Sequence, residues 1–274
     1  MTPDPTPRPL LDHGYIAYVD SWGSDHRIIQ AARMSTSKGF LGWERETVWV
    51  CGTCKYSLTN NYEPWVGHVI NCPNNCGLLE IDKAKSHAGD LKLLKYLYEH
   101  HHMTPFEMAG MAVEVQAPIF VFREWHRHRT QSYNELSARY TPLPDLNYVP
   151  TVERLLIPGG NNKQAIGLDG KVLDEYNAIV WNQELKDAYE NVQRVYQRGL
   201  DLGVPKELAR LPVSVGRYSR MMASANLRNW LQFLTLRMDE AAQYEIRVYA
   251  YAVAELIQEK FPRTYELFDK ERHV

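Results

Sequence analysis

The sequence predicts an α+β domain that is rich in helix and is interrupted once by a small insert. Three observations carry this prediction. Apolar residues alternate with other residues over 109–117, as in a half-buried strand. From about residue 174 onward, apolar residues recur at helical spacing almost to the end of the chain. Between residues 44 and 82 both periods are lost, and cysteine, asparagine, glycine and tryptophan gather there instead.

The N-terminal half alternates between strand and helix signals. A strand is expected over 14–20, followed by a short helix that Ser24 caps. After the insert, a helix should begin with Asp90 as its N-cap. Its buried face should carry three leucines: Leu91, Leu94 and Leu97. Pro118 should open a further helix, which runs into a basic segment ending at Arg129.

The C-terminal half should be mostly helical after a long connection. Residues 141–172 hold most of the remaining proline and glycine signals and should form loops. A long helix over 174–202 should stop at Gly203. Its apolar stripe would be Ile179, Leu185, Tyr189, Val192, Tyr196 and Leu200. Further helices are expected over about 205–210, 224–236 and 239–261, with Pro262 ending the last one.

Composition excludes several classes of protein. With 45% hydrophobic and 23% charged residues, the chain is an ordinary globular sequence. Its formal net charge of -2 argues against a dedicated nucleic-acid coat. No apolar run approaches the roughly 18 residues that a membrane span needs. Residues 1–13 form a polar, proline-rich stretch without a signal-peptide core. We therefore expect a flexible arm and a cytoplasmic protein, in a bacterial cell or a virus-infected host cell.

All four cysteines of the chain lie within the insert. They form two tight pairs, Cys51 with Cys54 and Cys72 with Cys76. Four thiolates in two short turns suit tetrahedral zinc, whereas two disulfides are the alternative interpretation. Disulfides are uncommon in proteins without a secretion signal. The spacing therefore predicts a zinc-ribbon-like insert over 44–82, in which a structural Zn²⁺ holds together a module too small to fold on its own.

A dense basic segment follows the strand over 109–117. It contains Arg123, His126, Arg127, His128 and Arg129, and Arg139 follows ten residues later. Arginine binds phosphate through paired N–H groups, so this pattern favours an anion site. A solvated helix face is the alternative. It fits poorly, because Trp125 and Tyr133 interleave with the charges.

This segment resembles the signature of the flavin-dependent thymidylate synthases, in which Arg-His-Arg is followed seven or eight residues later by Ser. Here Arg127-His-Arg129 is followed by Ser137, and residues 127–140 resemble that family nearly throughout. Further segments are similar to the family too: 31–35, 102–107, Asn226-Leu-Arg228 and Leu236-Arg237. The resemblance covers nearly the whole chain except the proline-rich arm and residues 44–82.

The resemblance implies the fold of that family, with a mixed or antiparallel sheet over 14–274, and a homotetramer with FAD and dUMP at its subunit junctions. The reaction would convert dUMP to dTMP, with methylene-tetrahydrofolate as carbon donor and NADPH as reductant. Residues implied to bind the cofactor are Ser35, His102, Thr104, Arg127, His128, Arg129, Glu135, Asn226, Arg228 and Gln232. Those implied to bind dUMP are Glu124, Arg127, Glu135, Leu136, Ser137, Ala138, Arg139, Arg210 and Arg237.

Within this set, Arg237 and Ser137 are the implied catalytic residues. Arg237 would stabilise uracil ionised at N3, which raises the electron density at C5. Ser137 is interpreted as a ligand of dUMP, since no base is identifiable around it. Glu124 stands where many relatives carry Gln. A cysteine nucleophile is excluded if every thiol binds zinc.

Two other hypotheses remain open. A nucleic-acid-binding protein with a zinc ribbon and an arginine-rich helix would explain both unusual segments. A catalytically silent member of the family would keep the fold without the reaction. A role of the insert in contacting another macromolecule is a variant of the main hypothesis.

Overall fold

A computed structural model describes residues 6–43, 47–50, 57–59, 85–86, 89–157 and 163–272. Within these ranges the chain forms a five-stranded sheet with the order β1-β2-β6-β8-β7, and all its pairings are antiparallel. The strands are β1 (Arg8–Leu10), β2 (Gly14–Trp22), β6 (Gly110–Pro118), β7 (Ser132–Glu135) and β8 (Tyr218–Asn226). The predicted strands over 14–20 and 109–117 are confirmed, and so is the antiparallel sheet.

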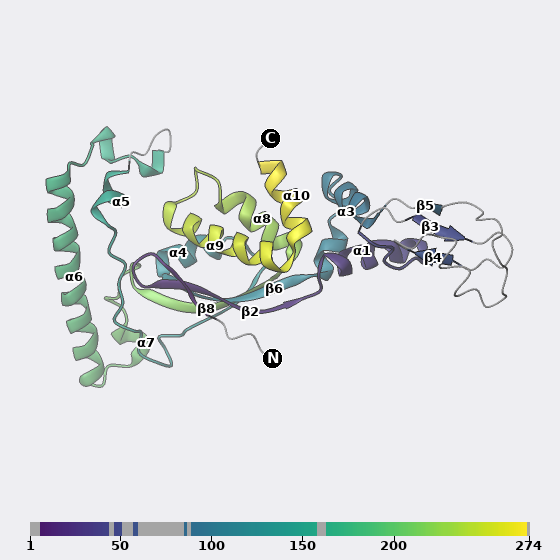
Figure 1. The fold of residues 1–274 in the computed structure, drawn as a ribbon. Coiled ribbons are helices and arrows are strands. Elements are labelled where there is room, and N and C mark those ends of the chain that lie inside the picture. The colour runs from purple at the N-terminus through teal and green to yellow at the C-terminus, as the bar shows by residue number, and fades with distance from the viewer. Residues whose placement is uncertain are drawn as a thin grey trace.

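Three helices pack on one face of this sheet (Figure 1): α4 (Ile119–Trp125), α8 (Leu227–Arg237) and α9 (Tyr244–Lys260). A fourth helix, α10 (Pro262–Arg272), packs against α9. The alternating residues of β6, namely Met111, Val113, Val115 and Ala117, are fully buried. Their burial against these helices explains the period of two in the sequence.

The opposite face of the sheet carries no helix in the part of the chain that Figure 1 draws as ribbon. Arg220 and Met222 of β8 are exposed, while their neighbours Met221 and Ala223 are buried. An antiparallel sheet tolerates one solvated face, but Met222 retains 40% of its surface there. This open face becomes relevant to subunit assembly below.

Smaller helices lie in the chain between β2 and β6. They are α1 (Asp25–Arg33), η1 (Met34–Thr36), α3 (Asp90–Glu99) and η2 (Thr104–Met108). Ser24 caps α1 as predicted. The N-cap of α3 is Gly89 rather than Asp90, whose buried carboxylate instead accepts hydrogen bonds from Arg33 and from the Leu41 amide, 2.6 Å away. Leu94 and Leu97 are buried as expected, but Leu91 is 42% exposed.

The insert begins and ends at a fixed stem. The Asp90 amide donates to the Gly42 carbonyl at 2.7 Å, and the Leu91 amide donates to the Trp43 carbonyl at 3.2 Å. The described strands of the insert, β3 (Thr47–Val50), β4 (Ser57–Thr59) and β5 (Lys85–Ser86), form a second antiparallel sheet with the order β4-β3-β5. The four cysteines lie outside the described residues.

The connection after β7 is longer and more helical than predicted. It contains α5 (Val152–Leu156) and the short helices η3 (Lys163–Ala165) and η4 (Leu168–Gly170). The 27-residue helix α6 (Glu175–Asp201) follows and stands at one end of the molecule (Figure 1). Gly203 ends it with φ of +81°, as predicted. The short helix α7 (Lys206–Ala209) leads into β8.

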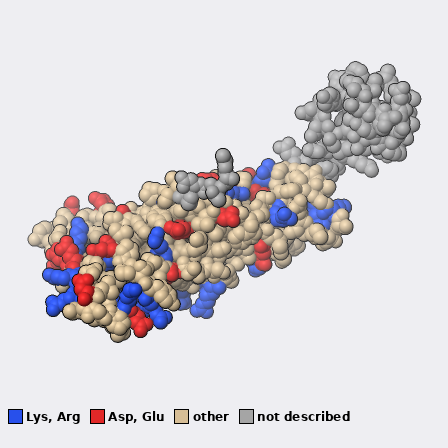
Figure 2. All heavy atoms as spheres, turned by 90° about the horizontal axis from the view of Figure 1, so that it is seen from below, with Lys and Arg blue, Asp and Glu red and all other residues tan. Residues whose placement is uncertain are grey.

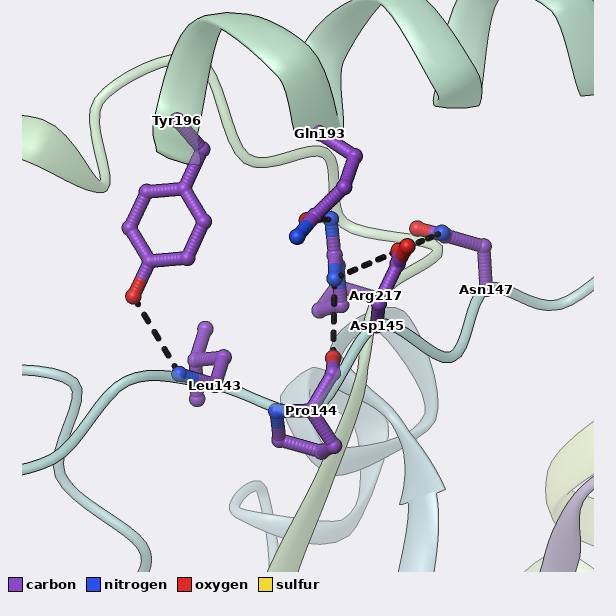
Figure 3. Close-up of polar contacts among 7 residues, drawn as sticks. All are labelled: Leu143, Pro144, Asp145, Asn147, Gln193, Tyr196 and Arg217. Atoms are coloured by element: carbon purple, nitrogen blue, oxygen red, sulfur yellow. Dashed lines mark hydrogen bonds and ion pairs between the residues drawn. The ribbon is translucent and has the colours of Figure 1, made fainter. Parts of the chain in front are cut away.

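A buried arginine joins α6 to the connection before it (Figure 3). Arg217, fully enclosed, donates to the Pro144 carbonyl at 2.8 Å, to Asp145 at 3.0 Å and to Gln193 of α6 at 2.8 Å. Beside it, the Tyr196 hydroxyl accepts from the Leu143 amide at 3.2 Å. Burial lowers the pKa of Arg217 from its ordinary value, and the guanidinium is held by these neighbours rather than by water.

Part of the predicted flexible arm is structured. Residues 8–10 form β1, and Arg8 makes ion pairs with Glu255 and Glu259 of α9. Glu245 of α9 is buried, accepts from the Tyr148 hydroxyl at 3.1 Å and pairs with Arg154 at 2.8 Å. No helix in the described ranges has the length and apolar character of a membrane span.

Candidate active site

The basic segment predicted to be helical leaves its helix at Trp125. Residues 126–131, here called the arginine turn, fold around the hydroxyl of Tyr133 from β7. This hydroxyl lies 2.7 Å from the His128 carbonyl and 3.1 Å from the Trp125 carbonyl. The Trp125 indole donates to Gln131 at 3.1 Å. The predicted helix therefore ends at Trp125 and does not continue through the basic segment, because the hydroxyl of the part-buried Tyr133 bonds to carbonyl groups that a further helical turn would use.

The basic side chains of the turn differ in burial. His128 is buried and packs edge-on against Phe233, with ring centroids 4.9 Å apart. Arg127 and Arg129 are exposed, and neither side chain makes a hydrogen bond or an ion pair with the described residues. Two exposed guanidinium groups in one turn, with no counter-ion among the described residues, are donors of the kind that bind anionic ligands.

Arg237, at the C-terminal end of α8, reaches this turn from the other side. Its Nε donates to His128 Nε2 at 2.9 Å, and its two terminal nitrogens donate at 2.8 Å to the Glu124 carboxylate and to the Glu124 carbonyl. The structure thus brings together three residues that the resemblance implied: Glu124, His128 and Arg237.

His128 is neutral in this arrangement. Burial, followed by the positive charge of Arg237, lowers the pKa of His128 to about 4, although Glu124 opposes the shift. Because the Arg237 Nε–H is the donor, His128 Nε2 must accept and the ring proton lies on Nδ1. The neutral imidazole orients Arg237 without adding charge.

The N-terminal end of α8 gathers most of the other implied cofactor residues. Asn226 caps the helix by accepting from the Asn229 amide at 3.0 Å, and Arg228 pairs with Glu107 of η2. His102 and Thr104, just before and at the start of η2, are exposed, as are Ser35 in η1 and Gln232 on α8. Arg228 and Arg237 are separated by about 14 Å along the helix, a span suited to an elongated ligand.

The implied nucleotide loop begins where β7 ends. After Glu135, the Leu136 amide donates to the Arg220 carbonyl at 2.8 Å. The Ser137 carbonyl then accepts from the amides of Tyr140 and Thr141, and its hydroxyl accepts from the Arg139 amide at 3.3 Å. Ala138 is buried within this turn. Ser137 has no base bonded to it among the described residues, which agrees with its interpretation as a ligand of the nucleotide.

Helix α7 contacts this loop through an acidic and a basic side chain, Glu207 and Lys206. The Arg139 guanidinium lies 3.2 Å from Glu207, and Lys206 donates to the Tyr140 carbonyl at 3.2 Å. Arg210 is exposed and lies close to the same helix, 3.4 Å from the Glu207 carbonyl. Arg139 and Arg210, distant in the sequence, therefore both contact Glu207, the first through its carboxylate and the second through its carbonyl.

Sequence reasoning missed the carboxylates that hold these arginines. Glu107 pairs with Arg228 and Glu207 with Arg139, across separations of 121 and 68 residues respectively. No local spacing could reveal such pairs. Tyr133, the residue that shapes the arginine turn, was noted only as an aromatic between charges.

The implied residues form three clusters, at Arg228, at Arg237 and at Ser137, each held together by the contacts described above. Helix α8 joins the cluster at Arg228 to the one at Arg237, while β7 separates both from the loop at Ser137. Within the described chain, no side-chain hydrogen bond joins Ser137 to the Arg237 cluster. Among the same residues, no group of three or more His, Cys, Asp or Glu side chains is placed to hold a metal ion. The predicted zinc ligands Cys51, Cys54, Cys72 and Cys76 lie outside the described residues.

Comparison with known proteins places these clusters in context. The chain is 34% identical over 259 residues to a flavin-dependent thymidylate synthase of Wolbachia pipientis, covering 94% of this chain and 75% of that protein. It is 33% identical to one of Thermosipho africanus, covering 95% and 93%. A solved structure of the UMP/dUMP methylase PolB from Streptomyces cacaoi, bound with 5-Br dUMP, superposes with a TM-score of 0.68. That protein is 28% identical, and the match covers 96% of this chain and 97% of that one.

The family comparison agrees with the relatives and with the geometry. Residues 17–263 match the family model described as thymidylate synthase complementing protein. The matched range contains the arginine turn, the nucleotide loop and α8. The chain therefore belongs to the thymidylate synthase complementing protein family.

Proposed function

We propose that this chain is a flavin-dependent thymidylate synthase, which transfers a one-carbon unit from methylene-tetrahydrofolate to dUMP and reduces it to the methyl group of dTMP. One observation carries the proposal: two exposed arginines, Arg127 and Arg129, lie in the same turn as His128. His128 and Glu124 together orient the Arg237 guanidinium. The names of the relatives agree with this reaction.

The donor set of the site fits FAD. The exposed guanidinium groups of Arg127 and Arg129 suit its two anionic phosphates. Thr104, Asn226, Arg228 and Gln232 offer further donors and acceptors along α8 and η2, with His102, Ser35 and Glu135 at the margins. When bound, FAD supplies the hydride, which NADPH replenishes. The protein supplies binding and orientation.

The nucleotide loop would bind dUMP through its phosphate. Arg139 and Arg210 present two guanidinium groups at one place, and the loop amides and the Ser137 hydroxyl add neutral donors. Glu207 forms with Arg139 an exposed ion pair of the kind that contributes about 0–1 kcal/mol. A phosphate displaces such a partner readily. Arg237 would then stabilise the negative charge on the uracil ring.

A homotetramer is part of the proposal. No side-chain hydrogen bond among the described residues joins the cluster at Ser137 to the one at Arg237, and residues from neighbouring copies would complete each site. Two surfaces suit such contacts: the open face of the sheet with Met222, and the exposed parts of α6, where Ile179, Trp181 and Val195 are 52%, 45% and 52% exposed. Exposed apolar side chains that gather on one element are a common feature of protein interfaces. A cytoplasmic location stays a prediction from the sequence.

UMP is a second candidate substrate, because the chain resembles a UMP/dUMP methylase whose solved structures include one bound with 5-Br UMP. The two nucleotides differ only in the 2′-hydroxyl group. Supplying each in turn, with product identification, distinguishes them.

Structural zinc in the insert also stays a proposal. The spacing of the four cysteines supports it, as does the small antiparallel sheet β4-β3-β5 that flanks them. Replacing residues 44–88 by a short glycine linker is feasible because Gly42 and Asp90 are already hydrogen-bonded. The shortened chain should contain no zinc and keep measurable dTMP formation; complete loss would give the insert a role in catalysis or assembly.

The proposal is tested by measuring dTMP formation with dUMP, methylene-tetrahydrofolate, FAD and NADPH, and by omitting each in turn. Product that requires FAD and the folate supports the proposal. A folded chain that binds FAD without forming product is a silent relative. A chain that binds neither FAD nor dUMP contradicts the proposal, and nucleic-acid binding would then be the alternative. Charge distribution does not favour that alternative: Figure 2 shows lysines and arginines interspersed with acidic residues over the end formed by α6.

A further inference from the structure

The ion pair between Arg237 and Glu124 leaves hydrogen-bonding groups of both kinds unused. A guanidinium has five N–H groups. Arg237 uses one on each of its three nitrogens, toward His128 Nε2, the Glu124 carboxylate and the Glu124 carbonyl. One N–H group therefore remains on each terminal nitrogen. These groups can donate to a ligand while the existing bonds hold the guanidinium still.

The carboxylate of Glu124 is also only half used. Oε2 accepts from Arg237 at 2.8 Å, whereas Oε1 has no hydrogen-bond partner among the described residues. The Glu124 side chain is 43% exposed and that of Arg237 is 15% exposed. The accessible part of the pair is therefore a free carboxylate oxygen beside a partly covered donor.

This combination matches the imide edge of uracil better than an arginine alone would. The N3–H of uracil is a donor that stands between two carbonyl acceptors. A lone guanidinium offers only donors, so it would face the N3–H group with another N–H group. A carboxylate oxygen next to a guanidinium N–H provides an acceptor for N3–H and a donor for the adjacent carbonyl oxygen.

We infer that Glu124 receives the N3 proton of the uracil ring while Arg237 holds the adjacent carbonyl oxygen. The N3–H bond breaks, the proton forms an O–H bond on Oε1, and the electron pair stays on the ring, where it is shared among N3, the carbonyl oxygens and C5. After the carbon has been transferred, the proton returns to N3 of the product. The inference rests on the proposed function, because it requires dUMP at Arg237.

The groups that face Glu124 are consistent with this role. They are Arg237 from α8 and His128 from the arginine turn, and His128 is neutral because its pKa is lowered to about 4. Arg123 lies one residue away on the same helix and is exposed. The competing interpretation is that Glu124 only orients Arg237, in which case Gln at this position should serve as well.

The first test compares the wild-type flavoprotein with Glu124→Gln. Gln keeps the shape, but its single oxygen can accept from Arg237 or from N3–H and not from both, and it cannot take the proton. We expect the Kd for dUMP to rise by no more than about tenfold, for the loss of one hydrogen bond, and the rate of dTMP formation at saturating dUMP to fall about 100-fold at neutral pH. The deficit should shrink by about tenfold per pH unit toward alkaline pH, as the N3 group ionises without a base. A deficit that is constant with pH, or none, would contradict the inference.

The second test measures binding alone. N3-methyl-dUMP lacks the N3–H group, so it should bind wild type at least about 10-fold more weakly than dUMP. With Glu124→Ala the difference between the two nucleotides should largely disappear. An equal difference in both proteins would mean that Glu124 does not face N3.

Two controls separate this inference from the proposed function. Glu266→Gln removes an exposed ion-pair carboxylate on α10 and should match wild type at every pH. The wild-type protein must first form dTMP from dUMP in an FAD-dependent manner. If it does not, the proposed function has failed; if it does and Glu124→Gln shows no pH-dependent deficit, only the inference about Glu124 has failed.

Discussion

Arg217 and the arginines of the candidate site show two opposite uses of the same side chain. Arg217 is fully enclosed, and a backbone carbonyl, Asp145 and Gln193 accept from it (Figure 3). Arg127 and Arg129 are exposed and have no side-chain partner among the described residues. Arg237 is intermediate, since its bonds fix its orientation and still leave two N–H groups unused.

Buried and exposed arginines therefore have different roles in this chain: the buried one stabilises the fold, and the exposed ones are available to bind a ligand. Desolvating an arginine is costly unless its donors are satisfied, so a buried arginine with several fixed acceptors holds segments together. In this chain Arg217 connects α6, β8 and the segment that follows the nucleotide loop. Arginines that stay open can instead accept an anion at little cost to folding. Substitutions in the two regions should therefore affect different measurements.

The largest effect is expected from Arg237→Ala. Loss of its charge beside the uracil ring should lower kcat about 100- to 1000-fold, as when one preorganised electrostatic group is removed. Bound FAD and the unfolding midpoint should change little. The matched control is Arg27→Ala, an exposed arginine of α1 outside the site. Wild-type turnover of Arg237→Ala would contradict the assigned role.

Arg217→Met should lower the stability of the fold and leave turnover nearly unchanged. It leaves the Pro144 carbonyl and Gln193 without their buried donor, so we expect the free energy of unfolding to fall by about 3 kcal/mol. Turnover measured well below the unfolding midpoint should stay within about threefold. Denaturant unfolding checks the first expectation, with Arg194→Met as the exposed control on α6, the helix that Arg217 contacts through Gln193. An unchanged stability would show that Arg217 is not a structural anchor.

His128 predicts a smaller effect that depends on pH. Its pKa is about 4 in the folded protein against an ordinary value of 6.5, so between these values the unfolded chain binds more protons. The free energy of unfolding therefore keeps this contribution in full above a pH of about 6.5. It falls as the pH drops toward about 4, by an amount on the order of 2 kcal/mol. His128→Gln, which keeps an acceptor for Arg237, should lack this contribution. Equal pH profiles for the two proteins would contradict a neutral, buried His128.

The smallest effect is expected from Glu207→Gln. Removing the carboxylate that pairs with Arg139 should improve dUMP affinity by about two- to fivefold, because the exposed ion pair contributes about 0–1 kcal/mol. The gain should shrink at high ionic strength. A weaker affinity would instead mean that Glu207 binds the nucleotide directly.

Much of the fold was accessible from the sequence, and the failures have physical reasons. The strand over 109–117 was predictable because its buried residues alternate strictly, and the helix ending at Gly203 because of its length. Strand β8 was missed, since Met221, Ala223 and Ala225 are weak strand formers that also suit a helix. The long helix expected before Pro262 does end there, since α9 stops at Lys260, but the further helix α10 that Pro262 begins was not predicted.

The site was predictable in its residues and not in its arrangement. The resemblance named Arg139, Arg210 and Arg237, whereas their partners are determined by tertiary packing. Glu207 approaches Arg139 because α7 follows the long helix α6, and Glu124 meets Arg237 across 113 residues. The shape of the arginine turn depends on Tyr133, which no local pattern identifies as its partner.

The central claim is that the open arginines of the turn bind the anionic cofactor, and FAD binding to the apoprotein tests it most directly. Flavin absorbance titrations would compare wild type with the double substitution Arg127→Gln and Arg129→Gln, using Arg27→Gln as the control. Two charged hydrogen-bond donors are lost, so the account predicts an affinity for FAD at least about 100-fold weaker, with the fold intact. An affinity within about threefold of wild type would contradict it.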